Sequence, residues 1–588
     1  MVLGAVALAL TAVTWRKWPD LIIDFGVQLY VPWKISQGAV LYRDIPYLTG
    51  GPLSQYFDSL VFRIFGASVL TLVWVNLGFL AALLAIVYRQ FHRAAGQWVA
   101  MLAGLSILLG FAFAQYSEHG VFNYVTPYSE EIYQGLVLAA LGVMLLARWA
   151  ENGKAAAAAG AGLCLGLVFL TKAEVFLALA AAALAALFCS RRSGRKWLVI
   201  ARASGIMMAA GVAPCLGFLA GFLRAGNWRQ SIAWTCWAWT PLLTTKAADS
   251  PFYRWCLGLD APWRHARQAL IDFVALAAVL TLSAAVLRRW KGGMAWLALA
   301  TPLTAAAYFM NWQECGLCLP LVCVTTLWLL WRRRAWPLQA FPMIWAVFSL
   351  TLLAKLGLYC RIWHYGFVLA MPAFLLGVYL LLKLLPQELE RRGVPSEKLR
   401  SLCAALLAIG LLQLILGSKY IYQKKTIPVA GGADLLWTFP PEEQPEGAGL
   451  ALADAWLQTN SPANSTLAVL PQGAMLNFLL RRDNPARYVR WNPPELAAFG
   501  QSNMTRVFEE HPPDYVATLG LDNGEFGARF LGDTPAFGQE LMQWIAAHYE
   551  PACSIGDDWT KTGRFGVKIS KRKDPGPQSG FDGSQKAR

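Results

Sequence analysis

The chain has 588 residues, of which 56% are hydrophobic and only 15% are charged. Its mean hydropathy of +0.42 and its 26 tryptophans exclude an ordinary soluble protein and predict a polytopic membrane protein. The formal net charge of +16 does not indicate a nucleic-acid partner. The basic residues lie in short loops between apolar runs, which is where membrane orientation places them.

Apolar runs long enough to cross a bilayer recur along most of the chain, and we expect about thirteen spanning helices. The predicted spans are residues 2–15, 66–88, 98–115, 132–149, 155–172, 174–189, 197–222, 266–287, 294–310, 317–331, 337–357, 365–385 and 399–417.

Two kinds of loop alternate between these spans. One kind is basic and by the positive-inside rule lies in the cytoplasm: residues 89–93, 148–154, 191–196, 288–293, 331–334 and 383–400. The other kind is aromatic, weakly charged and predicted to face outward: residues 18–65, 116–131, 223–265, 311–316 and 358–364. An odd number of spans then places the N-terminus in the cytoplasm and the C-terminal part outside. Arg16 and Lys17 fall on the outer side and run against this rule.

After about residue 418 the composition becomes that of a soluble protein. Helical spacing in 447–460, 475–482 and 538–550 alternates with strand patterns in 465–470, 514–521 and 564–570. We therefore expect a mainly α transmembrane domain, 1–417, and a small extracytoplasmic α/β domain, 418–570. The polar, Gly- and Pro-rich segment 571–588 is predicted to be a disordered tail.

The eleven cysteines show no metal-ligand spacing. Most lie in apolar runs and are interpreted as small core residues. Cys315 and Cys318 form a CxxC pair near a helix end. Its two interpretations are a disulfide or redox pair and two packing residues, and we favour packing.

Acidic residues are sparse, and none falls in the middle of a predicted span. This disfavours a transporter, because transporters commonly place ionisable or broken-helix sites near the midplane. The acids instead gather at the outer boundary, where basic residues from other loops are predicted to meet them. The acids are Asp24, Asp44, Glu118, Glu130 and Glu131, and the basic residues are Lys172, Arg361 and His364.

This arrangement suits transfer of a sugar from a lipid phosphate. Cations or a metal stabilise the charge that develops on the leaving phosphate. A carboxylate accepts the proton of the acceptor hydroxyl or amine. A lipid carrier is the natural donor outside the cell, and its tail needs a groove between membrane helices. The candidate catalytic residues are Asp24, Glu130 and Glu131, and the candidate donor-phosphate residues are Lys172, Arg361 and His364.

Each candidate also has a structural interpretation. Asp24 could cap a helix that begins at Phe25, and Glu130 and Glu131 could favour the dipole at a helix start. Lys172 could extend to the membrane interface, and Arg361 and His364 could anchor a helix there. Asp44 is better explained by pairing with Arg43 in a turn.

Several motifs together resemble the GT-C-fold glycosyltransferases that use polyprenyl-phosphate sugars. These are the early acid Asp24, the run Leu41-Tyr42-Arg43-Asp44 with Pro46-Tyr47, Leu170-Thr171-Lys172, and the segment 470–488. The family includes protein O-mannosyltransferases, the aminoarabinose transferase of lipid A, and bacterial galacturonosyl and mannosyl transferases. The resemblance implies a membrane glycosyltransferase of the plasma (inner) membrane, acting on a lipid, glycan or protein acceptor outside the cell.

The resemblance implies that Asp24 is the catalytic or metal-associated carboxylate, that Glu130 or Glu131 assists, and that Arg361 to Tyr365 contacts the donor phosphate. Ser129-Glu130-Glu131 stands where many members carry an acidic motif with Asp, so no cofactor is certain and Mg or Mn is possible. Gln472 stands where Glu is usual, so the 470–488 segment receives no catalytic role.

Two functions from other classes compete with this prediction. The hypothesis of a transporter or flippase of lipid-linked glycans predicts polar residues near the midplane, an inverted repeat and no large soluble tail. A structural or sensory protein, held by its helices, would bind cell-wall polymer through its C-terminal domain. About thirteen spans and an acid-bearing first loop exceed what an anchor requires.

Overall fold

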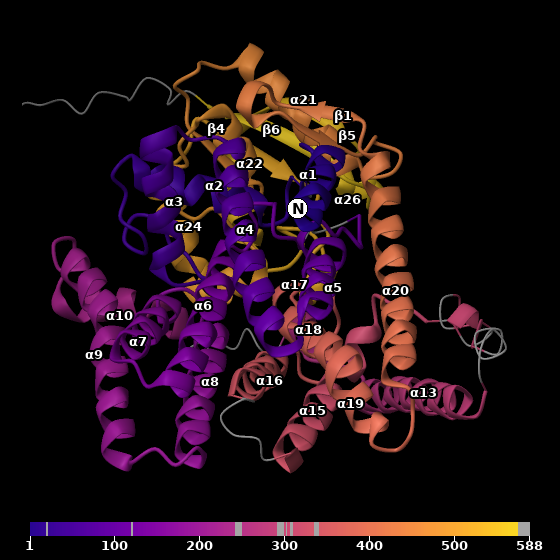
Figure 1. Ribbon diagram of the computed structural model, residues 1–588. Coiled ribbons are helices and arrows are strands. Elements are labelled where there is room, and N and C mark those ends of the chain that lie inside the picture. The colour runs from indigo at the N-terminus through magenta and orange to yellow at the C-terminus, as the bar shows by residue number, and fades with distance from the viewer. Residues whose placement is uncertain are drawn as a thin grey trace, which may run out of the picture.

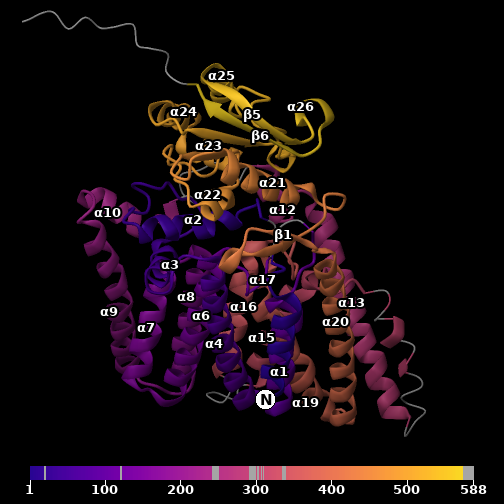
Figure 2. The ribbon, with the colours of Figure 1, turned by 90° about the horizontal axis from the view of Figure 1, so that it is seen from above.

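The computed structural model describes residues 1–18, 21–118, 122–240, 250–290, 299–300, 303–305, 308, 310–333 and 340–573. A bundle of helices forms most of the molecule, and a smaller α/β domain covers one end of it (Figures 1 and 2). In Figure 2 the N-terminus lies at the other end of the bundle.

Within the described residues, eight helical segments are long and apolar enough to cross a membrane. They are α4 (Val69–Ala95), α6 (Glu130–Asn152), α8 (Ala173–Arg192), α9 (Trp197–Phe222), α13 (Pro262–Arg289), η4 with α15 (Cys315–Arg333), α17 to α19 (Gly366–Glu390) and α20 (Ser396–Lys424). Four shorter apolar segments accompany them: α1 (Val2–Thr14), α5 with η1 (Gln97–Ala112), α7 (Ala155–Phe169) and α16 with η5 (Ala340–Leu356).

The chain is therefore a multi-pass membrane protein, but the predicted count of thirteen spans is not confirmed. The predicted span 294–310 falls mostly outside the described residues. Helices α1 and α7, at 13 and 15 residues, are shorter than the roughly 20 residues that an upright span needs.

Small residues let α7 and α9 pack closely. A Cβ added at Gly162 would meet the backbone of Met207, and one added at Gly166 would meet the backbone of Gly211. Between helices in a membrane, such close approach replaces the hydrophobic driving force that water provides elsewhere. The Ala- and Gly-rich composition of α7 is therefore explained by packing.

The first segment predicted to face outward, 18–65, contains two helices, α2 (Phe25–Ser36) and α3 (Pro52–Phe65). The turn before α3 lies against the bundle, where Gly51 N donates to Thr171 O (2.7 Å) and Leu53 N donates to Leu170 O (3.1 Å). A Cβ at Gly51 would meet the carbonyl of Leu170, so only glycine fits this close approach. The α7–α8 connection thus lies at the same end of the bundle as this segment.

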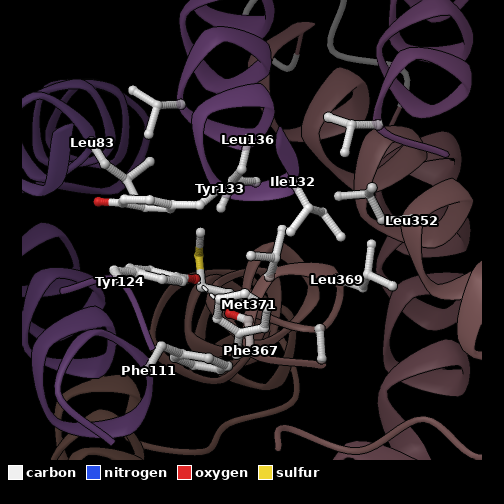
Figure 3. Close-up of a cluster of buried hydrophobic side chains, with 14 of the residues drawn as sticks. Leu83, Phe111, Tyr124, Ile132, Tyr133, Leu136, Leu352, Phe367, Leu369 and Met371 are labelled. Carbon is white, nitrogen blue, oxygen red and sulfur yellow. Dashed lines mark hydrogen bonds between the residues drawn. The ribbon is translucent and has the colours of Figure 1, made fainter. Parts of the chain in front are cut away.

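A buried aromatic cluster supports the start of α6 (Figure 3). The rings of Tyr124 and Tyr133 stack with centroids 4.7 Å apart, and the Tyr124 hydroxyl donates to the carbonyl of Phe367 at 2.6 Å. All three residues are no more than 1% exposed. This packing joins the second outward segment to α6 and α17 and fixes the position of Glu130 and Glu131.

The C-terminal domain contains a four-stranded sheet of order β3-β4-β6-β5. Its strands are β3 (Leu467–Leu470), β4 (Tyr515–Leu519), β5 (Tyr549–Gly556) and β6 (Gly566–Arg572). Strand β3 pairs parallel to β4, and the other neighbours are antiparallel. A separate hairpin pairs β1 (Ile427–Val429) with β2 (Leu436–Thr438).

The helices of this domain are α21 (Pro445–Asn460), α22 (Ala474–Leu480), α23 (Pro493–Phe499), α24 (Gln501–Glu510), α25 (Gln539–His548) and α26 (Trp559–Thr562). Each predicted helix and strand of the domain has an observed counterpart, whereas β1, β2, β5, α23, α24 and α26 were not predicted. Most of the predicted tail, from 574 onward, lies outside the described residues. Short helices α10 (Trp228–Thr235) and α12 (Pro251–Cys256) lie in the third outward segment.

Candidate active site

Asp24 lies where the first outward segment meets the C-terminal domain. It is the N-cap residue of α2, with a φ of 63°, yet its side chain makes no capping hydrogen bond. Its Oδ1 lies 2.6 Å from Nη2 of Arg490, and its Oδ2 accepts a hydrogen bond of 3.0 Å from the Tyr128 hydroxyl. The interpretation of Asp24 as a side-chain helix cap is therefore wrong.

Arg490 is positioned by the C-terminal domain. Residues Gln472 and Arg490 form an isolated antiparallel bridge, and Trp491 N donates to Pro471 O (2.6 Å). Trp491 is fully buried and packs edge-on against Phe508 in the core of the domain. Because neighbouring side chains of an extended segment point to opposite faces, burial of Trp491 directs Arg490 toward Asp24.

A second carboxylate also faces Arg490. Glu495, near the start of α23, places Oε1 3.5 Å from Nη1 of Arg490. Burial raises the pKa of Glu495, while the adjacent guanidinium opposes that shift. Sequence reasoning missed both residues, because the segment that attracted attention ended at 488. The available signal was a single arginine between the apolar residues Val489 and Trp491.

Aromatic side chains connect Asp24 with the predicted phosphate residues. Tyr128, which donates to Asp24, packs against Phe122 with ring centroids 4.9 Å apart. Phe122 in turn lies 4.6 Å from the ring of His364. The second and fifth of the segments predicted to face outward thus meet near Asp24.

Arg361 is fully buried in an aromatic box. Its guanidinium lies 4.1 Å from the ring centroids of Trp255 and Tyr359 and 4.7 Å from that of Trp363. Its Nε and Nη1 have no hydrogen-bond partner among the described residues. Because unpaired buried donors are costly, the box is suited to an anionic ligand oxygen.

His364 faces the guanidinium as a neutral ring. Its Nδ1 lies 3.3 Å from Nη2 of Arg361. Burial, reinforced by the charge of Arg361, lowers the pKa of His364 well below its usual range. The pair therefore carries one positive charge, that of Arg361.

A cavity of about 610 Å³ begins beside this box. Polar side chains line its part nearest the outward segments, and apolar side chains from α15, α18 (Met371–Tyr379) and α20 line the rest. Tyr359 belongs both to the cavity lining and to the box, and its ring stacks on His265 of α13 at 4.5 Å. The polar lining consists of Arg264, His265, Gln268, Asp272, Asn311, Glu314 and Tyr359.

Three further acids, Asp58, Glu130 and Glu131, lie inside the bundle at no more than 1% exposure. Asp58 accepts from Gln134 Nε2 at 3.0 Å, and Glu130 accepts from Asn76 Nδ2 at 2.9 Å. The second oxygens of all three carboxyl groups are buried without a hydrogen-bond partner, and within the described residues no ion pair involves them.

Tyr47 links the inner carboxyl cluster (Asp58, Glu130 and Glu131) with the surroundings of Arg490. Its hydroxyl donates to Glu131 and accepts from Gln55 Nε2 at 3.0 Å. Tyr47 and Arg490 line the same small hollow. Burial raises the pKa of Asp58, in α3, to about 8, although the hydrogen bond from Gln134 opposes the shift.

Lys172 holds the turn before α3 in place. It precedes α8, and its Nζ donates to the carbonyl of Thr49.

The structure thus brings Asp24, Arg361 and His364 together through aromatic contacts, and it connects Glu131 to the same region through Tyr47. Asp44 pairs with Arg43 at 2.9 Å, as predicted.

The residues around Asp24 do not fit a divalent ion in this arrangement. Across the described residues, no group of three or more His, Cys, Asp or Glu side chains could hold a metal ion. Arg490 and Tyr128 already engage the two oxygens of Asp24. Mg and Mn need several converging oxygen ligands.

No protein-family model and no curated protein sequence matches the chain. Among solved structures, the apo oligosaccharyltransferase of Archaeoglobus fulgidus has a TM-score of 0.50 and 13% identity, over 96% of this chain and 74% of that one. The same enzyme tethered to an acceptor peptide with the NVT sequon has a TM-score of 0.50 and 12% identity, over 96% and 73%. ArnT from Cupriavidus metallidurans bound to undecaprenyl phosphate has a TM-score of 0.46 and 12% identity, over 97% of each chain.

The likeness to the archaeal oligosaccharyltransferase extends over nearly the whole chain, including its C-terminal part. It confirms the predicted fold class: the chain has the GT-C fold.

Proposed function

We propose that the protein is a membrane glycosyltransferase that transfers a sugar from a polyprenyl-phosphate donor to an acceptor outside the cytoplasm. The GT-C fold supports the class of reaction. The observation that carries the proposal is the contact path from the amphipathic cavity, through Tyr359, Arg361, His364, Phe122 and Tyr128, to Asp24.

In this proposal the cavity holds part of the lipid chain, and the polar lining lies toward its phosphate. Arg361, with two unpaired donors, and His364 stabilise the charge on the leaving phosphate. Asp24 accepts the proton of the acceptor hydroxyl or amine as the bond to the sugar forms. A carboxylate has about four lone-pair sites, so contacts from Arg490 and Tyr128 leave room for that proton.

Catalytic roles for Glu130 and Glu131 and a phosphate-binding role for Lys172 stay predictions. Their contacts favour structural roles, because Glu131 accepts a hydrogen bond from Tyr47 and Lys172 donates one to the turn before α3. The plasma-membrane location, with the C-terminal domain outside and the N-terminus in the cytoplasm, also belongs to the proposal.

The test compares Asp24→Asn with Asp44→Asn in purified protein reconstituted with a labelled polyprenyl-phosphate sugar and a membrane extract as acceptor. Asp44 is a matched control, because it belongs to the same outward segment and is already paired with Arg43. We expect the Asp24 variant to lose transfer and the Asp44 variant to retain it. Full transfer by a folded Asp24→Asn protein would refute the assignment.

Mass spectrometry of envelope glycans identifies the acceptor. Cells that lack the protein are expected to lose one sugar from a lipid, a glycan or a protein. Unchanged glycans in such cells, together with altered sidedness of a lipid-linked glycan, would instead favour a flippase.

A further inference from the structure

We propose that Arg490, carried by the C-terminal domain, is a positioning residue for Asp24 and supplies the fixed positive charge of this site, so that catalysis needs no divalent ion. This inference rests on the proposed function of Asp24. It assigns the C-terminal domain a direct part in the active site.

Arg490 places a permanent positive charge against Asp24. Its Nη2 lies 2.6 Å from Asp24 Oδ1, and its Nη1 lies 3.5 Å from Glu495 Oε1. One permanently charged guanidinium therefore lies against two carboxylates and attracts both. With the Tyr128 bond on Oδ2, each oxygen of Asp24 has a partner, a phenol on one side and a guanidinium on the other.

The burial of the three groups separates this contact from an ordinary surface ion pair. The Arg490 side chain is 8% exposed and that of Glu495 is 9% exposed, while Asp24 keeps 28% exposure. The guanidinium is thus shielded from solvent, and the carboxylate that it orients remains accessible to an acceptor. A carboxylate held in this way is preorganised for proton transfer.

The backbone that carries Arg490 is fixed to both parts of the protein. On the domain side, the bridge to Gln472 and the buried Trp491 hold it. On the membrane side, α2 and α22 approach so closely that a Cβ at Gly26 would meet the backbone of Met475. Arg490 therefore reaches Asp24 only when the domain is docked on α2.

A second ion pair between α2 and the same domain provides a matched control. Lys34 Nζ lies 2.6 Å from Asp483 Oδ1 near the other end of α2. Asp483 is 54% exposed, so this pair holds the domain without facing the site. If Arg490 served only to dock the domain, removal of either pair would have the same consequence.

The experiment measures kcat and donor KM for Arg490→Gln, Arg490→Lys and Lys34→Gln, each with and without free guanidinium ion and with and without EDTA. We expect Arg490→Gln to lower kcat about 100-fold, the loss that follows when a reacting group is misplaced by about 1 Å, with little change in KM. Free guanidinium should restore part of this loss, and Arg490→Lys should be intermediate. Lys34→Gln should remain close to the native protein, and EDTA should not affect the native enzyme.

Several outcomes overturn the proposal. They are an unchanged kcat in Arg490→Gln, an equal loss of kcat in Lys34→Gln, or a loss of native activity with EDTA that added Mg or Mn restores.

If Arg490→Gln does not fold, as judged by thermal unfolding in detergent, Glu495→Gln replaces it. That variant keeps the Arg490 charge beside Asp24 but removes the second carboxylate that holds the guanidinium. We expect a smaller loss of kcat than in Arg490→Gln, with unchanged KM. An unchanged kcat would count against the proposal. Full activity of Asp24→Asn would instead refute the proposed function.

Discussion

Two groups of carboxylates, one around Arg490 and one bonded to Tyr47 through Glu131, differ in their partners. Asp24 and Glu495 share the guanidinium of Arg490, and Asp24 is partly exposed. Asp58, Glu130 and Glu131 are buried and receive hydrogen bonds only from amides and a phenol among the described residues. A nearby cation, and for Asp24 partial exposure, suit the first group to the proposed proton transfer. The second group, with no cation to offset its burial, is suited to holding protons and joining helices.

The largest contrast is expected between Asp24→Asn and Asp58→Asn. If Asp24 is the general base, as we propose, the first variant should react about 100- to 10,000-fold more slowly. The second keeps an acceptor for Gln134 in a buried position away from Arg490, and its rate should remain near native. Initial rates of sugar transfer at saturating donor measure both. Equal losses would show that the two groups act as one site.

Removal of the Asp58 carboxyl group is expected to lower the stability of the protein, although it should leave the transfer rate nearly unchanged. Asp58→Ala leaves Gln134 Nε2 buried without its acceptor, which costs about 1–3 kcal/mol. The Asp44→Ala variant, altered at an exposed position of the same segment, serves as the control. Thermal or denaturant unfolding in detergent measures the difference. An Asp58→Ala protein as stable as the native one would contradict a structural role for the inner cluster.

The pH dependence of stability tests protonation of the inner cluster. The pKa of Asp58 is about 8 in the folded protein and 3.8 for the ordinary side chain. As pH rises between these values, the unfolded state loses the proton that the folded state keeps, so the free energy of unfolding should fall. Asp58→Asn should remove part of this dependence. Parallel stability curves for the two proteins from pH 4 to pH 8 would exclude a raised pKa.

The smallest effect is expected from Arg43→Gln. Its partner Asp44 lies in the same turn, and both side chains are more than a third exposed. Such pairs contribute about 0–1 kcal/mol and weaken with salt. Transfer activity and unfolding in low and high salt should both stay close to native. A large activity loss would give this turn a functional role that its contacts do not suggest.

The sequence predicted most of the architecture because apolar runs and their periodicity directly reflect burial in lipid. It failed where lipid burial was not the cause of structure. Helix α3 is amphipathic and lay within a segment interpreted mainly as loop, so Asp58 attracted no attention. Strand β5 is an edge strand with mostly exposed residues, which carry little apolar signal.

The candidate site was predictable in part for a similar reason. Asp24, Arg361 and His364 could be selected because ionisable residues are rare at a lipid boundary. Arg490 and Glu495 come from a soluble segment, where charged residues are common and single positions are not distinctive. Their meeting with Asp24 depends on how the domain docks onto α2, and sequence spacing contains no information on that contact.

The contact at Gly26 limits how this protein can vary. Because α2 and α22 meet backbone to backbone there, even one methyl group would separate the two parts of the molecule. The Asp24–Arg490 pair lies two residues away, so such a separation would open it as well. The membrane bundle and the α/β domain are therefore expected to change together in evolution. If either part is replaced by the corresponding part of a distant homologue, we expect each part to fold but the chimeric protein to lack transfer activity.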